Sequence, residues 1–308
     1  MVRQDGFGII MGMTVIHDTK VKKLEEIAAK VRQDIIEMLV EAKSGHSAGP
    51  LGMADIFVAF YFHILHHDPK NPDWPERDRL ILSNGHICPV RYAVMIEAGY
   101  YPREWLKRLR KFGSPFQGHP ERLRCPGVET TSGPLGSGLS QAAGLAYAAK
   151  MDGKKWRTYC LTSDAEHGAG VHWEAALFAG RNKLSNLTVV IDRNNIEIDG
   201  FTEDIMPLEP LADKYRAFNW HVLEVNGHDI EEFVAAVEEA KSIFEKPTAI
   251  IAHTIPGRGV SYMENRFEWH GNPPGTIEPP GSPPKAEQVK IALEDLRTLG
   301  GRIVAEHQ

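Results

Sequence analysis

Short apolar segments alternate with amphipathic stretches along most of the chain. Five segments are short, apolar and followed by Gly, Asn or a helical pattern, so each is predicted to be a buried strand: Arg79–Ser83, Thr158–Thr162, Leu187–Asp192, Trp220–Val225 and Thr248–His253. Strands that alternate with helices favour an α/β fold with a mainly parallel, doubly wound sheet and helices on both of its faces.

A long amphipathic helix is predicted from Asp18 to Lys43. Asp18 is the expected N-cap, and Gly45 follows the expected end of the helix. The apolar residues that recur on one helical face are Leu24, Ile27, Ala28, Val31, Ile35 and Leu39. This helix therefore leads the chain to His46.

The body of the chain contains no internal repeat and no Gly/Ser linker. After Gly271 the sequence becomes NPPGTIEPPGSPPK, which we expect to run extended over the surface, followed by a short helix at Ala286–Leu296. We therefore expect three parts: an N-terminal extension (residues 1–17), one domain (residues 18–271) and a Pro-rich C-terminal extension (residues 272–308).

An acidic residue and an amide follow two of the predicted strands. Asp164 follows the segment Thr158–Thr162, Asn194 follows Leu187–Asp192, and a helical stretch lies between the two strands. A strand-helix-strand unit forms a parallel pair, whose ligands bind beyond the carboxyl ends of the strands. One carboxylate, one amide oxygen and one backbone carbonyl are a suitable protein contribution to a Mg²⁺ site. The arrangement suits a magnesium-diphosphate site.

Composition excludes some classes of partner. The net charge is −6 and the Lys and Arg residues form no basic stripe, so nucleic acid is not expected as a partner. The apolar patch among the first residues is too short and too poorly flanked to span a membrane. Cys88, Cys125 and Cys160 lie far apart without a CxxC pair, which favours a reducing, cytoplasmic location.

Four histidines directly follow a glycine, which is more than random placement predicts: His46, His86, His119 and His228. Glycine allows tight turns and close approach of the backbone to a ligand. Imidazoles can donate to phosphate oxygens, carry protons near neutral pH and stabilise a developing alkoxide. A single histidine is more often a cap or a surface residue, so the function of these four depends on their sequence contexts.

Several of these contexts resemble motifs of the transketolase family. The stretch from Ser163 to Gly200 is similar to its thiamine-diphosphate motif, which begins Gly-Asp-Gly and closes on Asn. The segments KSGHSAGPLGMADIF, LSNGH, QGHPE, GVETTSGPLGSG and WHG resemble further family motifs. The resemblance extends from about His17 to Gly271, and it implies the thiamine diphosphate-binding fold.

The resemblance also implies roles for individual residues. Asp164, Asn194 and the carbonyl of Ile196 would hold Mg²⁺, for which Ca²⁺ or Mn²⁺ can substitute. His46, His119 and His270 would face the ketose as catalytic residues. The implied contacts to thiamine diphosphate are His86, Gly133, Pro134, Leu135, Asp164, Ala165, Asn194 and His270.

The resemblance covers only the diphosphate-binding domain of a full transketolase. The pyrimidine-binding domain, which supplies the glutamate needed for cofactor deprotonation, is absent from this chain. We therefore expect the N-terminal subunit of a split transketolase that transfers a two-carbon ketol unit between sugar phosphates. Its expected partner is a C-terminal subunit with the pyrimidine-binding domain, in a dimer of heterodimers.

The chain departs from the family motif at several positions. Ser163 and Ala165 replace the two glycines of Gly-Asp-Gly, and we expect a cost of about 1–3 kcal/mol if Ala165 requires a positive φ or tight clearance. Ala169 stands where transketolases have an interface glutamate, and Glu166 and His167 are unusual neighbours. These changes bear on cofactor affinity and on coupling between active sites.

Several alternatives remain at this point. Within the superfamily these are a deoxyxylulose-phosphate synthase and the alpha subunit of a 2-oxo-acid dehydrogenase, although the GHPE and GVETTSGPLG segments favour transketolase. The altered motif also permits a non-catalytic binding or regulatory subunit, which the retained histidines oppose. A helical metal face at His63, His66 and His67 is disfavoured because no carboxylate or cysteine completes it. The segment Asn226–Asp229 is interpreted as a structural turn.

Overall fold

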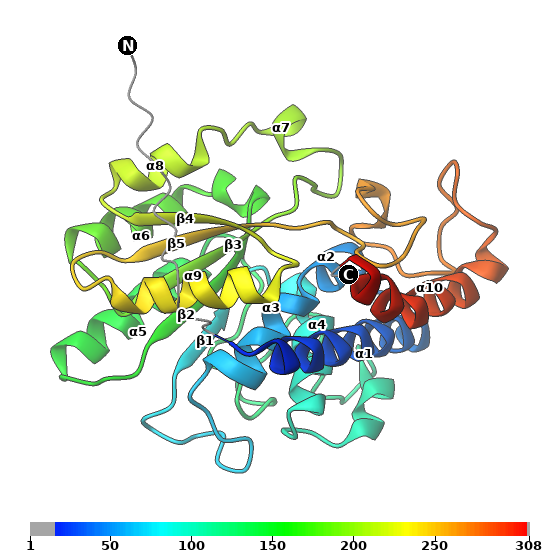
Figure 1. Ribbon diagram of the computed structural model, residues 1–308, viewed down its shortest axis with the longest axis horizontal. Coiled ribbons are helices and arrows are strands. Elements are labelled where there is room, and N and C mark those ends of the chain that lie inside the picture. Colours follow the sequence, from blue (N-terminus) through cyan, green and yellow to red (C-terminus); the bar gives the residue numbers. More distant parts are fainter. Residues whose placement is uncertain (1–15, 307–308) are drawn as a thin grey trace.

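The computed structural model describes residues 16–306, and within them the strands form one five-stranded sheet in the order β1-β2-β3-β5-β4 (Figure 1). All neighbouring strands are parallel. The strands are β1 (Arg79–Leu82), β2 (Thr158–Ser163), β3 (Leu187–Arg193), β4 (His221–Asn226) and β5 (Thr248–His253). The strand predictions are therefore confirmed to within one residue at each end.

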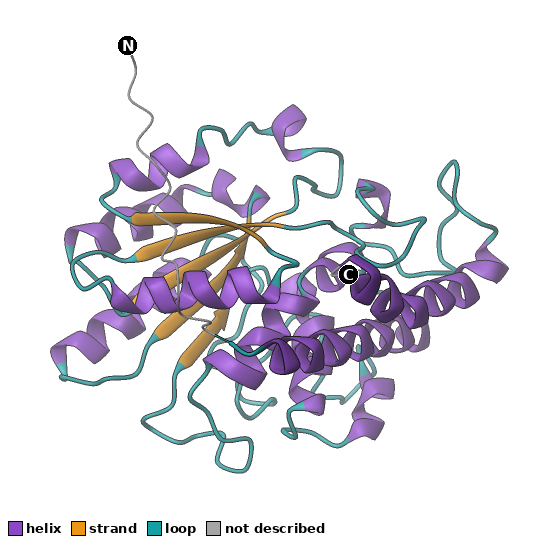
Figure 2. Ribbon diagram, in the orientation of Figure 1, coloured by secondary structure: helices purple, strands orange, loops and turns teal. Residues whose placement is uncertain are grey.

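Helices cover both faces of the sheet (Figure 2). They are α1 (Asp18–Ala42), α2 (Ala48–Gly52), α3 (Ala54–Ala59), α4 (Cys88–Glu97), α5 (Gly138–Met151), α6 (Gly170–Arg181), α7 (Thr202–Ile205), α8 (Leu211–Ala217), α9 (Ile230–Ser242) and α10 (Lys285–Glu306). A π-helical turn spans Phe60–Ile64, and 3-10 turns span Gly85–Ile87, Arg103–Arg108, Ala165–Gly168 and Phe267–Trp269.

The strands bury side chains in two separate cores, one on each face of the sheet. In β2, Tyr159 and Leu161 join the core formed with α1, α3, α4 and α9, whereas Cys160 joins the core formed with α5, α6 and α8. Successive side chains of a strand point to opposite faces, so a strand covered on both sides is apolar throughout. This arrangement confirms the predicted doubly wound α/β fold.

Helix α1 agrees with its prediction except at the cap. The helix begins at Asp18, but His17 is the capping residue and makes no side-chain cap hydrogen bond. At the other end, Lys43 adopts a left-handed conformation with φ 55°, and its N–H donates to the Leu39 carbonyl. The expected N-cap at Asp18 is therefore wrong by one position.

The C-terminal segment is more ordered than its composition indicates. Pro273 and Pro274 are buried, so the Pro-rich stretch does not lie wholly on the surface as expected. Gln288 donates to the carbonyls of Ile277 and Pro283 at 2.9 Å, which fastens this stretch to α10. Helix α10 packs along α1 and extends well past the predicted end at Leu296 (Figure 1). Most of the predicted N-terminal extension, residues 1–15, lies outside the described residues.

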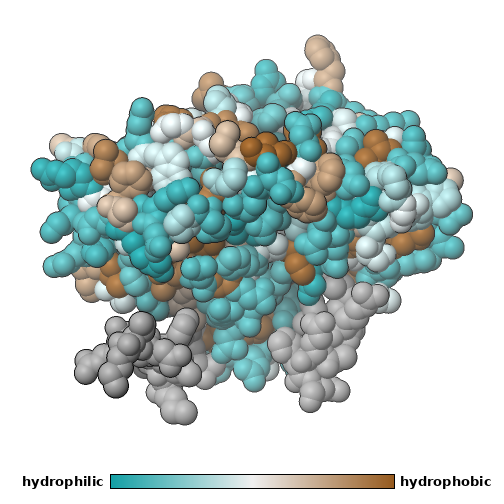
Figure 3. All heavy atoms as spheres, turned by 90° about the horizontal axis from the view of Figure 1, so that it is seen from above, coloured by the Kyte–Doolittle hydropathy of each residue, from teal (hydrophilic) through white to brown (hydrophobic). Residues whose placement is uncertain are grey.

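The described surface is largely hydrophilic when seen from above, with apolar side chains in small groups (Figure 3). No helix in the described part of the chain is both long and apolar enough to cross a bilayer.

Candidate active site

A hollow of about 380 Å³ lies beyond the carboxyl ends of β1, β2 and β3. Its lining contains every predicted site residue except Pro134 and Asp164, namely His46, His86, His119, Gly133, Leu135, Ala165, Asn194, Ile196 and His270. Gly49, Ile87, Ser163, Glu197, Ile198 and Asp199 complete the lining. Residues from distant parts of the chain therefore meet at the edge of the sheet where ligands of such folds bind.

Three of the predicted histidines touch one another in this hollow. The ring centroids of His46 and His86 are 4.7 Å apart, those of His46 and His270 are 5.3 Å apart, and those of His86 and His270 are 5.2 Å apart. His119 lies close by, because a Cβ added to Gly85 would be 3.2 Å from its Cδ2 atom. A side chain at Gly85 would therefore crowd both Ser132 and His119.

Burial keeps these imidazoles neutral. It lowers the pKa of His46 to about 3, with smaller contributions from the charges of His270, Arg110 and His119. Burial also lowers the pKa of His270 to about 4 and holds the pKa of His86 well below its usual value. The Nδ1 atoms of His46 and His270 are buried without a hydrogen-bond partner among the described residues. Buried polar atoms are normally paired, so these two nitrogens are exceptions in residues whose rings line the hollow.

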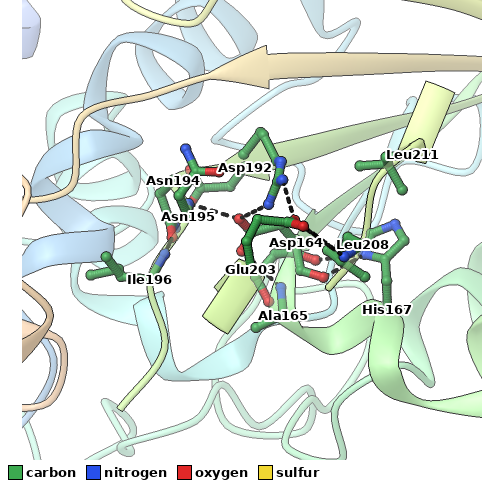
Figure 4. Close-up of polar contacts among 12 residues, drawn as sticks. Asp164, Ala165, His167, Asp192, Asn194, Asn195, Ile196, Glu203, Leu208 and Leu211 are labelled. Atoms are coloured by element: carbon green, nitrogen blue, oxygen red, sulfur yellow. Dashed lines mark hydrogen bonds and ion pairs between the residues drawn. The ribbon is translucent and has the colours of Figure 1, made fainter. Parts of the chain in front are cut away.

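Asp164 is fully buried at the end of β2 (Figure 4). Its Oδ1 accepts a hydrogen bond from the Ala165 N–H at 2.7 Å. Its Oδ2 accepts from the Asn195 N–H at 2.7 Å and from the Arg193 guanidinium at 3.0 Å. Asn195 has φ 63°, a left-handed conformation that asparagine tolerates better than most residues. Burial raises the pKa of Asp164, and these donors oppose the shift.

The Arg193 guanidinium also contacts two glutamates from the segment after β3. It lies 2.6 Å from Glu203 and 2.9 Å from Glu209. Together with Asp164, three carboxylates surround one guanidinium, so the cluster carries an excess of negative charge. Arg193 itself is 4% exposed, so its role in the site is to hold these carboxylates in place.

Hydrogen bonds fix the orientation of the Asn194 amide. Its Nδ2 donates to Asp192 at 2.8 Å, and its Oδ1 accepts from the Ile196 N–H at 3.0 Å. Asp192 in turn accepts from the Thr254 hydroxyl. These contacts direct the amide oxygen of Asn194 toward Ile196, its predicted fellow ligand.

The donor set fits a divalent cation. Oδ1 of Asp164 and Oδ1 of Asn194 each accept only one hydrogen bond, and the Ile196 carbonyl accepts none from the described residues. Oxygen donors beside excess negative charge are what Mg²⁺ requires. Within residues 16–306, no group of three or more His, Cys, Asp or Glu side chains could hold a metal. The predicted set has a single carboxylate, joined by an amide oxygen and a backbone carbonyl, so it is not a group of that kind.

The glycine loop fits a flat apolar ring. A Cβ added to Gly133 would meet no protein atom within 4 Å, so the backbone is open to the hollow at this point. Leu135 is 46% exposed and lines the hollow. Gly136 has φ 82°, and a Cβ there would lie 2.5 Å from the Cβ of Ala169. The protein's own structure therefore requires glycine at Gly136, whereas it leaves space for a side chain at Gly133.

The altered motif residues are accommodated without backbone strain. Ala165 starts the turn Ala165–Gly168 and is not among the described residues with positive φ. The conformational part of the expected cost at Ala165 is therefore absent. The Ser163 hydroxyl lies 3.3 Å from Glu166, and Ala169 packs against Gly136.

Several residues of the site were not predicted from the sequence. No role was assigned from the sequence to Arg193, which lies within the Ser163–Gly200 motif, or to Glu203 and Glu209, and the tertiary fold brings all three to Asp164. His167 donates from Nδ1 to the Ser163 and Asp164 carbonyls, and its Nε2 lies 2.9 Å from the Tyr215 hydroxyl. Further residues around the site without a predicted role are Arg110, Ser83, Glu166 and His172.

The weaker histidine groups have structural roles. His63 lies in the turn Phe60–Ile64, whereas His67 lies beyond it and bonds Tyr100 at 2.7 Å, so the predicted helical spacing does not form a metal face. The segment Asn226–Asp229 is a turn, as interpreted. Within it, His228 is 2.8 Å from Asp55 and accepts from the Ile255 N–H at 2.8 Å.

Two other hollows of about 470 Å³ lie elsewhere. One is formed by α1, the turn Arg103–Arg108 and α10, and the other is formed around α8. Neither brings together a comparable group of histidines and oxygen donors. The hollow at the carboxyl edge of the sheet is therefore the candidate active site.

Residues 24–278 match the family described as "Transketolase, thiamine diphosphate binding domain". The match covers most of the domain predicted from the sequence. It includes the histidine segments, the glycine loop and the Asp164–Asn194 motif.

Relatives of similar length are components of transketolases. The chain is 42% identical over 80% of its length to 6-deoxy-6-sulfo-D-fructose transketolase subunit SqwG of Clostridium sp. (strain MSTE9), and covers 90% of that protein. It is 40% identical over 83% of its length to one of the subunits of the apulose-4-phosphate transketolase of Phocaeicola vulgatus, again covering 90%.

Longer transketolases share the fold. A transketolase from Pichia stipitis superimposes with a TM-score of 0.80 at 33% identity, over 91% of this chain and 41% of that one. The transketolase from Leishmania mexicana gives a TM-score of 0.77 at 34% identity, over 92% of this chain and 45% of that one. The chain therefore spans less than half the length of these solved transketolases.

The fold and the site define a thiamine diphosphate-binding α/β domain. The chain belongs to the transketolase family, and it is a component of an enzyme of that family. The predictions of family, fold and enzyme class are confirmed. The superfamily alternatives, a deoxyxylulose-phosphate synthase and a 2-oxo-acid dehydrogenase alpha subunit, are set aside by the same matches.

Proposed function

We propose that this chain is the N-terminal subunit of a split transketolase that moves a two-carbon ketol unit from a ketose phosphate to an aldose phosphate. The observation that carries the proposal is the convergence of four histidines with Asn194 on one hollow, beside Asp164. Thiamine diphosphate supplies, when bound, the nucleophilic carbon and the electron sink for this chemistry.

The chain's own residues would bind and orient the cofactor. Asp164, Asn194 and the Ile196 carbonyl would hold Mg²⁺ against the diphosphate, because their oxygens have free acceptor capacity. His86 would donate to the diphosphate, near the backbone of Ala165. The open stretch Gly133–Leu135, which includes Pro134, would lie against the cofactor rings.

The remaining histidines would hold and move protons of the sugar. His46 and His270 are neutral at physiological pH and line the hollow, so each can exchange a hydrogen bond or a proton with a sugar hydroxyl group. His119 lies beside them, with its pKa lowered by burial and by the Arg110 charge. General acid-base help of this kind contributes about 10²–10⁴-fold in rate.

A separate partner chain would complete the active site. The relatives that match over 90% of their length are named as transketolase subunits, which supports a two-chain enzyme. Exposed apolar side chains on α5 and α6 support a contact surface on this side of the domain: Tyr147, Met151, Val171, Leu177 and Phe178. The expected assembly is two copies of each chain.

The substrates would be sugars with a terminal anion. The two relatives act, by their names, on 6-deoxy-6-sulfo-D-fructose and on apulose 4-phosphate, so one carries a sulfonate and the other a phosphate. Similarity at about 40% identity supports the reaction type and leaves the particular sugar to be measured.

The alternative is a non-catalytic homologue that binds a partner without turnover. Erosion of the Gly-Asp-Gly motif favours it, whereas the ordinary backbone at Ala165 and the intact oxygen set around Asp164 oppose it. Magnesium-dependent cofactor binding separates the two proposals, because a scaffold has no need of it.

Co-purification tests the two-chain proposal. The tagged chain is isolated from its native extract with thiamine diphosphate and Mg²⁺, and the eluate is analysed for co-eluting proteins and for ketol transfer from xylulose 5-phosphate to ribose 5-phosphate. We expect a partner with a pyrimidine-binding domain. An active chain without any partner contradicts the proposal, and a stable partner without cofactor binding supports the scaffold.

A further inference from the structure

The carboxylate of Glu166 is buried against three segments of the site. Glu166 lies in the turn Ala165–Gly168 and is 2% exposed. Its Oε1 accepts hydrogen bonds from the Ser83 hydroxyl and from the Gly136 N–H, the latter at 3.1 Å. Its Oε2 accepts from the Ser163 N–H at 3.0 Å and from the Ser163 hydroxyl at 3.3 Å. Four donors therefore converge on one carboxylate.

Each donor belongs to a segment that faces the candidate active site. Ser83 follows β1 and leads into the turn that carries His86. Gly136 closes the glycine loop that lines the hollow. Ser163 ends β2 and immediately precedes Asp164. Glu166 does not line the hollow, so it can act on a ligand only through these segments.

The same network holds the beginning of α5. The Ser83 hydroxyl, which donates to Glu166, accepts a hydrogen bond from the Gly138 N–H at 3.1 Å. A Cβ added to Gly138 would lie 2.3 Å from the Cβ of Ser83, so the two segments are in direct contact. The glycine loop is therefore held on both sides of Ser137 by groups bonded to one carboxylate.

A buried carboxylate is unfavourable unless hydrogen bonds replace its hydration. Glu166 has those bonds, and each is strengthened by the charge of its acceptor. The carboxylate can therefore order loops that lie far apart in the sequence. A preformed cavity binds its ligand more tightly. When a loop adopts its binding conformation in only a fraction of the molecules, the apparent affinity falls by that fraction.

We infer that Glu166 is a positioning residue that fixes the β1, β2 and glycine-loop segments relative to one another and so preforms the thiamine diphosphate cavity. The inference deepens the proposed function and rests on it. It also gives a role to Ser163, whose hydroxyl adds a donor that the glycine of the family motif lacks.

Replacement by glutamine is a sharp test because it preserves the shape of the side chain. Either orientation of the amide turns an –NH₂ group toward a backbone N–H, that of Gly136 or that of Ser163. A serine hydroxyl can rotate to accept a hydrogen bond, but a backbone N–H cannot. Glu166→Gln therefore breaks one arm of the network without removing volume.

Binding of thiamine diphosphate to the full chain is measured by calorimetry at saturating Mg²⁺, together with its partner once that chain is in hand. We expect the Kd to rise at least about tenfold for Glu166→Gln, as for a buried donor left unpaired. The matched control is Glu245→Gln, at an exposed position that makes no described contact with the site, and its Kd should stay within about twofold of wild type.

Hydrogen exchange separates a local loosening of these segments from a general loss of stability. We expect faster exchange at the amides of residues 133, 135–138 and 163–166 in Glu166→Gln, with unchanged protection in β3 and β5. Ser83→Ala, which removes one donor and no charge, should show the same pattern in weaker form. This milder variant keeps the test valid if the glutamine variant does not fold.

The outcomes separate the inference from the proposed function. If the wild-type chain and its complex do not bind thiamine diphosphate, the proposed function fails. If wild type binds and both variants bind equally well with unchanged exchange in residues 133–138, the inference is overturned. Faster exchange confined to these segments, with weaker binding, supports it.

Discussion

The guanidinium of Arg193 lies 3.0 Å from Oδ2 of Asp164, and both side chains are almost completely buried. The contact joins a residue at the end of β3 to the predicted metal ligand at the end of β2. It leaves Oδ1 of Asp164 as the oxygen with free acceptor capacity. Arg193 thus orients the carboxylate. Its own positive charge also limits how much further positive charge can bind beside Asp164.

Replacing Arg193 by methionine should destabilise the chain. The variant leaves Asp164 buried without its cation, so the free energy of unfolding in EDTA should fall by about 3 kcal/mol. Adding Mg²⁺ should raise the melting temperature more in this variant than in wild type, because the cation replaces the lost positive charge. Arg216→Met, which removes an exposed pair with Asp213, serves as the control and should change little. Equal melting temperatures of Arg193→Met and wild type in EDTA contradict this assignment.

Replacing Asp164 by alanine should abolish magnesium-dependent cofactor binding. Asp164 is the only carboxylate of the predicted donor set, so its loss should weaken thiamine diphosphate binding by about 100-fold or more. Calorimetric titration with and without Mg²⁺ measures the effect, and Asp213→Ala at the surface is the control. If Mg²⁺ still strengthens binding in Asp164→Ala, the ion is held elsewhere.

The two glycines of the loop should respond differently to alanine. At Gly136, φ is 82° and the new Cβ would lie 2.5 Å from Ala169, so Gly136→Ala should lower the unfolding free energy by about 1–3 kcal/mol. At Gly133 the new Cβ meets no protein atom within 4 Å, so Gly133→Ala should be as stable as wild type. Gly133→Ala should nevertheless bind thiamine diphosphate more weakly if the cofactor occupies that space. Unchanged affinity for this variant removes Gly133 from the binding site.

The buried histidines predict a stability that falls in mild acid. The folded-state pKa of His46 is about 3 and that of His270 is about 4, both below the unfolded value of about 6.5. The unfolded chain therefore takes up protons first, so stability should be greatest above about pH 6.5 and decline as pH falls toward 4. Denaturant unfolding between pH 8 and pH 4 measures this slope. His270→Asn should reduce the slope, and the same slope in both proteins contradicts the assignment.

Strand positions could be predicted because the strands contain short apolar runs bounded by polar residues, although β4 also contains the polar residue Glu224. The strand Thr248–His253 was predicted with both ends correct. Asp164 and Asn194 could be predicted for a related reason, since parallel strands place their carboxyl ends at one edge of the sheet. Helix α10 was predicted too short: it runs from Lys285 to Glu306, through Gly300 and Gly301, which have low helix propensity.

The supporting residues could not be predicted from sequence. Glu166 contacts Ser83 and Gly136 across large gaps in the chain, and neither contact leaves a periodic pattern. The same holds for Arg193, whose position in a buried strand favours an apolar residue unless its partners are known. The roles of the histidines and of the metal oxygens stay predictions until they are measured.

The central claim is that this chain performs ketol transfer only together with a second, separate chain. The direct measurement is the rate of transfer from xylulose 5-phosphate to ribose 5-phosphate by the purified chain, by the purified partner and by the two combined, with thiamine diphosphate and Mg²⁺. We predict turnover for the combined chains and none for either alone, with loss of the combined activity in Asp164→Ala. Turnover by this chain alone, or full activity of the partner without it, contradicts the account.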